Sequence, residues 1–107
     1  MNIPNFVTRS EQSVRPEELF RPHPGEIFAR RCLSSGDIKQ AEAAALIGIS
    51  VKHLSRFING HVSVGVDLAR KLEACTKISA HAWLHYQTQF DLYTTAKLEK
   101  SPKLLSA

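Results

Sequence analysis

Two short helical segments separated by one glycine constrain the fold of this chain more than any other feature. The first, about Lys39 to Ile47, is rich in alanine, which favours a helix and lets a neighbouring helix approach closely. Gly48 follows, and glycine readily takes the left-handed conformation in which many helices end. Ser50 is a good N-cap for the second segment, Val51 to Ile58. This order predicts a helix-turn-helix spanning roughly Gln40 to Asn59.

The second segment of this pair has an apolar back and a polar front. Leu54, Phe57 and Ile58 recur at helical spacing and form the side that faces inward. The side that is left facing outward carries Val51, Lys52, His53, Ser55 and Arg56. A helix of this kind, held at a fixed angle by its apolar back, has the form of an element that reads a DNA groove.

The helix-turn-helix is therefore predicted to bind double-stranded DNA in the major groove. Lys52 and Arg56 share one side of the helix and can bind guanine acceptors or phosphate oxygens, although outside this frame they would be ordinary solvated charges. Gln40 begins the preceding helix, whose N-terminus favours an anion, and Lys39 adds a positive charge beside it. The candidate DNA-binding residues are Lys39, Gln40, Ser50, Val51, Lys52, His53, Ser55, Arg56 and His61.

Three further helices complete a predicted all-α domain of five helices. The first runs from Glu26 to Leu33, after a proline and a glycine that suit a helix start. A loop, His61 to Gly65, carries valines that look exposed. It leads into a fourth helix, about Val66 to Thr76, and then into the fifth and longest, about Ala80 to Leu98.

The fifth helix has two apolar faces. One consists of Trp83, Tyr86, Gln87, Phe90 and Tyr93. The other consists of Leu84 and Leu92, with Thr88 between them. Because a helix at the edge of a small domain buries only one face within that domain, the second face indicates a partner chain. We expect Trp83 to be part of the core, and we predict a two-fold homodimer with contact residues Trp83, Leu84, Thr88, Asp91 and Leu92.

Composition narrows the remaining possibilities. The 107 residues allow one compact domain, and 43% hydrophobic with 22% charged residues is typical of a globular chain. A net charge of +4 is compatible with an anionic partner but does not establish one. No signal peptide and no apolar run of membrane-spanning length is evident, which predicts a cytoplasmic protein without a membrane partner.

No pattern of an enzyme is recognisable, so no catalytic residue, cofactor or metal ion is expected. His81 and His85 stand four residues apart on the fifth helix, but Ala82 occupies the place of a zinc-protease glutamate and no third ligand is obvious. Cys32 and Cys75 are interpreted as small buried hydrophobic residues in a reducing compartment, in preference to a disulfide or metal ligands.

Three parts are expected along the chain. Residues 1–22 hold three prolines and balanced charges, which predicts an extended or weakly ordered arm with a short helical turn around Pro16 to Phe20. Residues 23–100 form the helix-turn-helix domain with its dimerisation helix, and residues 101–107 form a tail.

Several short motifs from His23 to Leu92 resemble those of one known family. They are His23-Pro24-Gly25-Glu26-Ile27, Gln40-Ala41-Glu42, Gly48-Ile49-Ser50, Ile58-Asn59-Gly60, and Trp83-Leu84 followed by Gln87 and Phe90-Asp91-Leu92. The family is that of the HigA-type antitoxins, also called virulence-associated protein I-like, in the Xre/Cro helix-turn-helix superfamily. The fold that this resemblance implies is the five-helix, lambda-repressor-like DNA-binding domain.

The resemblance also implies a function and partners. Such a protein dimerises, binds operator DNA in its own promoter, represses its toxin–antitoxin operon and neutralises a HigB-like ribonuclease toxin. The sequence departs from the family where Lys39 replaces a capping Ser or Thr, and where Arg30 and Arg31 make the first helix basic. Two alternatives stay open: a stand-alone Xre-family transcriptional regulator without a toxin, and an adaptor with this fold that binds only protein.

Overall fold

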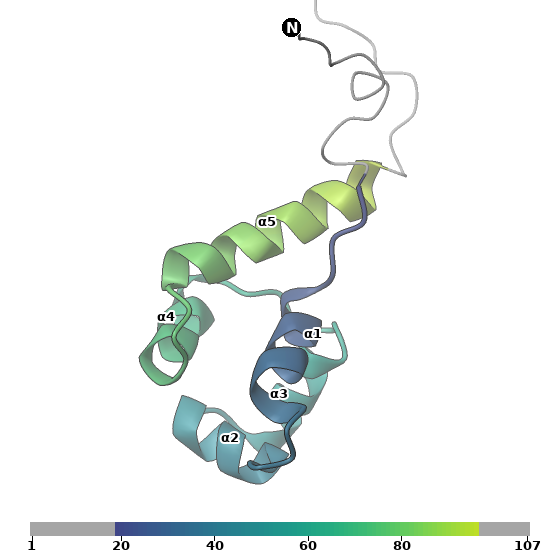
Figure 1. Ribbon diagram of the computed structural model, residues 1–107. Helices are drawn as coiled ribbons and strands as arrows, with labels where there is room; N and C mark the ends of the chain where they lie inside the picture. The colour runs from purple at the N-terminus through teal and green to yellow at the C-terminus, as the bar shows by residue number, and fades with distance from the viewer. Residues whose placement is uncertain (1–18, 97–107) are drawn as a thin grey trace, which may run out of the picture.

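The computed structural model describes residues 19–96, and this part of the chain is entirely helical with connecting turns (Figure 1). The elements are α1 (Pro24–Phe28), the π-helical turn η4 (Ala29–Leu33), α2 (Gln40–Ile47), α3 (Val51–Ile58), α4 (Val66–Cys75) and α5 (Ala80–Ala96). Helix α2 lies at one end of the molecule and α5 runs along the other, with α1 and α3 side by side between them and α4 on the opposite side. The predicted all-α fold is confirmed. None of the described helices combines the length and the apolar character that crossing a membrane requires.

The start of α1 is fixed by three consecutive residues. His23 caps the helix, because its Nδ1 accepts a hydrogen bond of 2.9 Å from the backbone N–H of Gly25. Pro24 lies in the first turn, where its missing N–H costs nothing. Gly25 packs so closely on α3 that a Cβ atom would overlap the carbonyl oxygen of Phe57 and lie 2.7 Å from its carbonyl carbon. The absence of a side chain at this position therefore lets α1 contact the backbone of α3.

The first helix differs from the expectation in its second half. Instead of one α-helix to Leu33, the chain changes after Phe28 to the wider π-helical turn η4. A single turn is too short for apolar spacing to distinguish an α-helix from a π-helix, so the sequence pattern could not show the change. The hydroxyl of Ser34 donates to the carbonyl of Arg30 and satisfies one of the last backbone acceptors.

Helix α2 begins one residue later than expected, with Lys39 as its N-cap. Lysine offers no capping oxygen, but the Glu42 carboxylate accepts a hydrogen bond of 3.4 Å from the backbone N–H of Lys39. At the other end Gly48 has a φ of 91°, the left-handed conformation that the sequence predicts.

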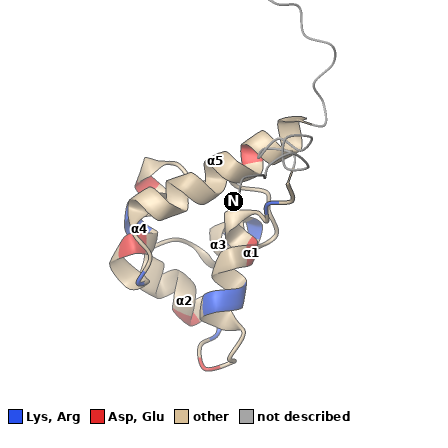
Figure 2. Ribbon diagram, turned by 45° about the horizontal axis from the view of Figure 1, so that its top comes forward, with Lys and Arg blue, Asp and Glu red and all other residues tan. Residues whose placement is uncertain are grey.

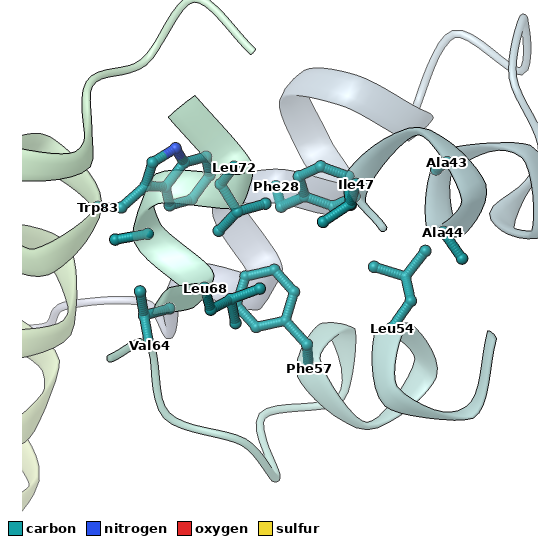
Figure 3. Close-up of a cluster of buried hydrophobic side chains, with 11 residues drawn as sticks. Phe28, Ala43, Ala44, Ile47, Leu54, Phe57, Val64, Leu68, Leu72 and Trp83 are labelled. Carbon is teal, nitrogen blue, oxygen red and sulfur yellow. The ribbon is translucent and has the colours of Figure 1, made fainter. Parts of the chain in front are cut away.

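The core joins all five helices around aromatic rings (Figure 3). Phe28, Phe57 and Trp83 come from α1, α3 and α5, and their ring centroids lie 5.9 to 6.5 Å apart. Leu54 and Leu72 are fully buried beside them. Because these residues come from distant parts of the sequence, the core fixes the helices relative to one another.

The connection before α4 is held by α5. The Gln87 side-chain oxygen accepts a hydrogen bond of 2.8 Å from the backbone N–H of Val64. Val64 is buried, so the expectation that the valines of this loop are exposed is wrong for this residue. Helix α4 ends at Cys75, one residue earlier than expected, and Thr76 donates its hydroxyl to the Leu72 carbonyl at 2.7 Å.

The expectations about the chain ends and the cysteines are met only in part. Residues 1–18 and 97–107 lie outside the described residues, so most of the predicted arm, the last residues of the fifth helix and the tail stay predictions. Leu19 and Phe20 are described and are not helical. Both cysteines were expected to be buried: Cys32 is half-buried, which meets the expectation in part, and Cys75 is exposed, so the expectation is wrong for Cys75.

Candidate nucleic-acid interface

The geometry of the turn presents α3 at a defined angle. Helix α3 spans Val51 to Ile58 as predicted, and the hydroxyl of Ser50 accepts a hydrogen bond of 3.0 Å from the backbone N–H of His53. Ser50 therefore caps the first turn of α3. After Gly48, the N–H of Ile49 also bonds to the carbonyl of Ala44 at 3.0 Å, which ties the turn to the end of α2.

The back of α3 is anchored to α2 and to the core. Leu54 and Phe57 are completely buried, and Ala43 and Ala44 of α2 are buried against the same core. Figure 3 shows Leu54 beside the two alanines. Small side chains on α2 let the two helices approach closely, as the sequence predicts, so the outer face of α3 is held in a fixed orientation.

Most of the predicted DNA-binding residues lie on the surface of the molecule. Lys52 and Arg56 are exposed on α3. The ion pairs among residues 19–96 are Arg30–Glu26 at 2.6 Å and Lys71–Asp67 at 3.3 Å, so the charges of Lys52 and Arg56 are not neutralised by any described residue. The other predicted residues that are exposed are Lys39, Gln40, Ser50, Val51 and His61.

Two predicted residues of α3 are less accessible than the outward face would imply. His53 and Ser55 are half-buried. The Nε2 atom of His53 is buried and has no hydrogen-bond partner among the described residues, so this nitrogen does not point freely outward. The prediction that both side chains face solvent is therefore correct only in part.

Basic residues are also found beside the turn that leads to α2. Arg30 and Arg31 form the blue band that follows α1 in Figure 2, and both are exposed. Arg30 pairs with Glu26, whereas Arg31 takes no part in the ion pairs of the described chain. The basic character that the sequence indicates for the first helix is thus carried chiefly by Arg31.

The residues predicted for dimer contact divide into two groups. Trp83 has an exposed fraction of 0%, so it belongs to the core of the single chain and has no surface to offer a second copy. The prediction that Trp83 contributes to the dimer contact is therefore wrong, whereas the expectation that it is a core residue is confirmed. Leu84 is half-buried, and Thr88, Asp91 and Leu92 are exposed on the outer side of α5.

The sequence placed His23 in a motif and Gln87 on one face of the fifth helix, but it did not reveal the structural contacts of either residue. Gln87 is buried, and it bonds the Val64 N–H through its oxygen and the Asp91 carboxylate at 2.9 Å through its nitrogen. His23 is buried too, with its ring 4.9 Å from that of Phe90. The sequence did contain a sign of the contacts of Gln87: it is a polar residue within an otherwise apolar helical stripe, and a buried polar side chain needs a hydrogen-bond partner.

Comparison with known proteins agrees with this geometry. The family model described as helix-turn-helix matches residues 28–83. A Nostoc punctiforme protein described as an antidote of a plasmid maintenance system is 31% identical, with a TM-score of 0.69 over 75% of this chain and 87% of that one. No curated protein sequence matches the chain.

Two further solved structures carry HigA in their descriptions. The Coxiella burnetii addiction module antidote protein of a HigA family is 25% identical, with a TM-score of 0.67 over 78% of this chain and all of that one. The Pseudomonas aeruginosa antitoxin HigA, solved with the higBA promoter, is 26% identical, with a TM-score of 0.67 over 79% of this chain and all of that one. The chain therefore belongs to the helix-turn-helix family and is antitoxin-like within it, as its resemblance to the HigA-type antitoxins predicts.

Proposed function

We propose that this protein is a sequence-specific DNA-binding antitoxin that represses its own toxin–antitoxin operon. The observation that carries the proposal is the outer face of α3, where Lys52 and Arg56 are exposed and have no ion-pair partner among the described residues. A similar antitoxin, HigA of Pseudomonas aeruginosa, was solved with its promoter. Such a protein acts where the DNA lies, in the cytoplasm.

Each exposed residue has a chemical role in this proposal. Arg56 and Lys52 bind guanine acceptors or phosphate oxygens in the major groove. Gln40 stands at the N-terminus of α2, where the backbone N–H groups favour a phosphate, and Lys39 adds charge to the same contact. The remaining contacts come from the surface around α3 and from the following loop: Ser50, Val51, His53, Ser55 and His61.

A homodimer completes the proposed DNA-binding unit. Two α3 helices related by a two-fold axis reach successive major grooves if they lie roughly 34 Å apart. The outer side of α5 supplies the contact, through Leu84, Thr88, Asp91 and Leu92. Leu92 is the large apolar residue of this set that remains exposed, at 45%.

Neutralisation of a HigB-like ribonuclease toxin is the further part of the proposal. It is supported by the family resemblance and by relatives that are described as antidotes. Co-expression with the product of the neighbouring gene tests it: a toxin that co-purifies with this protein and is inactive in the complex is the expected result. If no toxin gene adjoins this one, the stand-alone regulator is the better description.

Mutation of α3 tests the DNA-binding part. Arg56→Ala and Lys52→Ala should each weaken binding to DNA from the protein's own promoter, by about 1–3 kcal/mol for a residue that reads a guanine. Affinity is measured by gel-shift titration at several salt concentrations, and Lys77→Ala is the control because Lys77 is exposed in the turn between α4 and α5. Wild-type binding by the double variant would show that α3 does not read the DNA.

A further inference from the structure

Two cysteines from distant parts of the chain line the same small cavity. Cys32 belongs to η4, and Cys75 is the last residue of α4. The cavity has a volume of about 170 Å³, and its lining is mostly apolar: Phe28, Cys32, Leu33, Ile38, Ala43, Leu46, Ile47, Cys75 and Thr76. The helix-turn-helix function uses neither thiol.

Both cysteines line this one cavity, so their thiols share the same surroundings. Burial raises the pKa of Cys32. Burial also raises the pKa of Cys75, and the charge of Cys32 raises it further, so the two thiols lie within electrostatic range of each other. Cys75 directs its Sγ back along α4, 3.4 Å from the carbonyl oxygen of Lys71 and 3.6 Å from that of Leu72.

We propose that Cys32 and Cys75 form an intramolecular disulfide across this cavity when the protein meets a small disulfide such as oxidised glutathione. Cys75 is the more exposed of the two, so it attacks first as a thiolate, forms a mixed disulfide and releases one molecule of glutathione. The Cys32 thiolate then attacks the Cys75 sulfur and releases the second. The protein loses two electrons and two protons, and both are recovered in two molecules of reduced glutathione.

The disulfide would affect α2, the helix that supports α3, and would leave the outer face of α3 unchanged. Ala43 and Ile47, two residues of the cavity lining, belong to α2, the helix on which α3 rests. Lys52 and Arg56 are not part of the lining. A covalent link between Cys32 and Cys75 closes a long loop of chain that contains both α2 and α3, which restricts the unfolded chain and stabilises the folded one.

Equilibration of the folded protein with reduced and oxidised glutathione tests the proposal. After free thiols are blocked with N-ethylmaleimide, intact mass should show a species two hydrogens lighter than the unmodified chain and without adducts. Peptide mapping should locate the link between Cys32 and Cys75. The melting temperature of this species should exceed that of the reduced protein by roughly 10 °C.

Single variants provide the matched controls. Cys32→Ser should carry one glutathione on Cys75, and Cys75→Ser should at most carry one on Cys32, because neither can close the ring. The proposal is overturned if the wild-type chain takes up two glutathiones, forms a disulfide-linked dimer, or stays reduced where Cys32→Ser is modified. It is also overturned if the oxidised species melts below the reduced one, since the cavity would then have to distort to bring the sulfurs together. These readouts do not involve DNA, so their outcome is independent of the proposed function.

Discussion

Gly25 shows how one missing side chain sets the distance between two helices. Its Cα faces the backbone of α3 at Phe57 and Ile58, where a Cβ has no room and the obstructing atoms are main-chain atoms that cannot rotate away. Gly25→Ala should therefore destabilise the protein by about 3 kcal/mol. Urea unfolding measures the change, and Gly65→Ala is the matched control, because a Cβ at Gly65 meets nothing within 4 Å. Equal losses in the two variants would contradict the close packing at Gly25.

His23 makes the stability of the same helix start depend on pH. Burial lowers the pKa of His23 below 6.5, although a backbone hydrogen bond with Val62 and the charges of Asp91 and Glu26 oppose this and His61 adds to it. The unfolded chain therefore takes up a proton at a higher pH than the folded one does. The stability contributed by neutral His23 is complete above pH 6.5, and it is lost as the pH falls from 6.5 through the lowered pKa.

The test compares the wild type with His23→Asn, because asparagine is also a good N-cap and does not titrate in this range. Unfolding free energies at pH 7.5 and in steps below 6.5 should decrease more steeply for the wild type than for the variant. Parallel pH profiles would mean that the His23 pKa is not lowered on folding.

At the scale of helices, α3 and α4 differ in their first turns. Ser50 caps α3 with its hydroxyl, whereas Gly65 at the start of α4 has no side chain to do so, although its φ of −97° and ψ of −175° are those of an ordinary N-cap. Ser50→Ala should cost about 1 kcal/mol, and Gly65→Ser should gain a few tenths of a kcal/mol. Thermal unfolding of the two variants measures both changes, and a loss of stability in Gly65→Ser would show that the new hydroxyl does not reach the α4 backbone.

The same local signals explain which helices could be predicted from the sequence. The Ser50 cap and the Gly48 stop are chemical properties of single residues, so the bounds of α3 were predicted correctly and α2 was misplaced by one residue only. Val64 donates its backbone N–H to Gln87, which is far away in the sequence. The spacing of apolar residues cannot predict such a long-range contact. The π-helical turn η4 was missed for a related reason, since one turn is too short to reveal its period.

In the candidate site, too, local features could be predicted from the sequence and long-range contacts could not. Exposure of Lys52 and Arg56 follows from helical spacing against Leu54 and Phe57, so sequence reasoning placed them correctly. The Nε2 atom of His53 is covered, although helical periodicity places His53 among the outward-facing residues. Trp83 was assigned both to the core and to the dimer contact, and only coordinates could choose between them.

For the whole molecule, the proposed dimer determines how strongly one DNA site is held. Leu92 is 45% exposed on the outer side of α5, and a charge introduced there would have to be buried in a two-fold contact. Leu92→Glu should therefore shift the protein from dimer to monomer in sedimentation experiments at micromolar concentration. Val66→Glu is the matched control, because Val66 is a 62% exposed aliphatic residue at the start of α4, where a carboxylate suits the helix N-terminus.

DNA binding should decline together with dimerisation. A monomer holds one half-site, so it loses the gain in effective concentration that links two half-sites, and its affinity for promoter DNA should fall by about a hundredfold. It also contacts fewer phosphates, so the slope of log affinity against log salt concentration should become roughly half as steep. If Leu92→Glu stays dimeric, the contact lies elsewhere; if it is monomeric and keeps wild-type affinity and salt slope, each chain binds DNA alone and the paired α3 helices are not the reading unit.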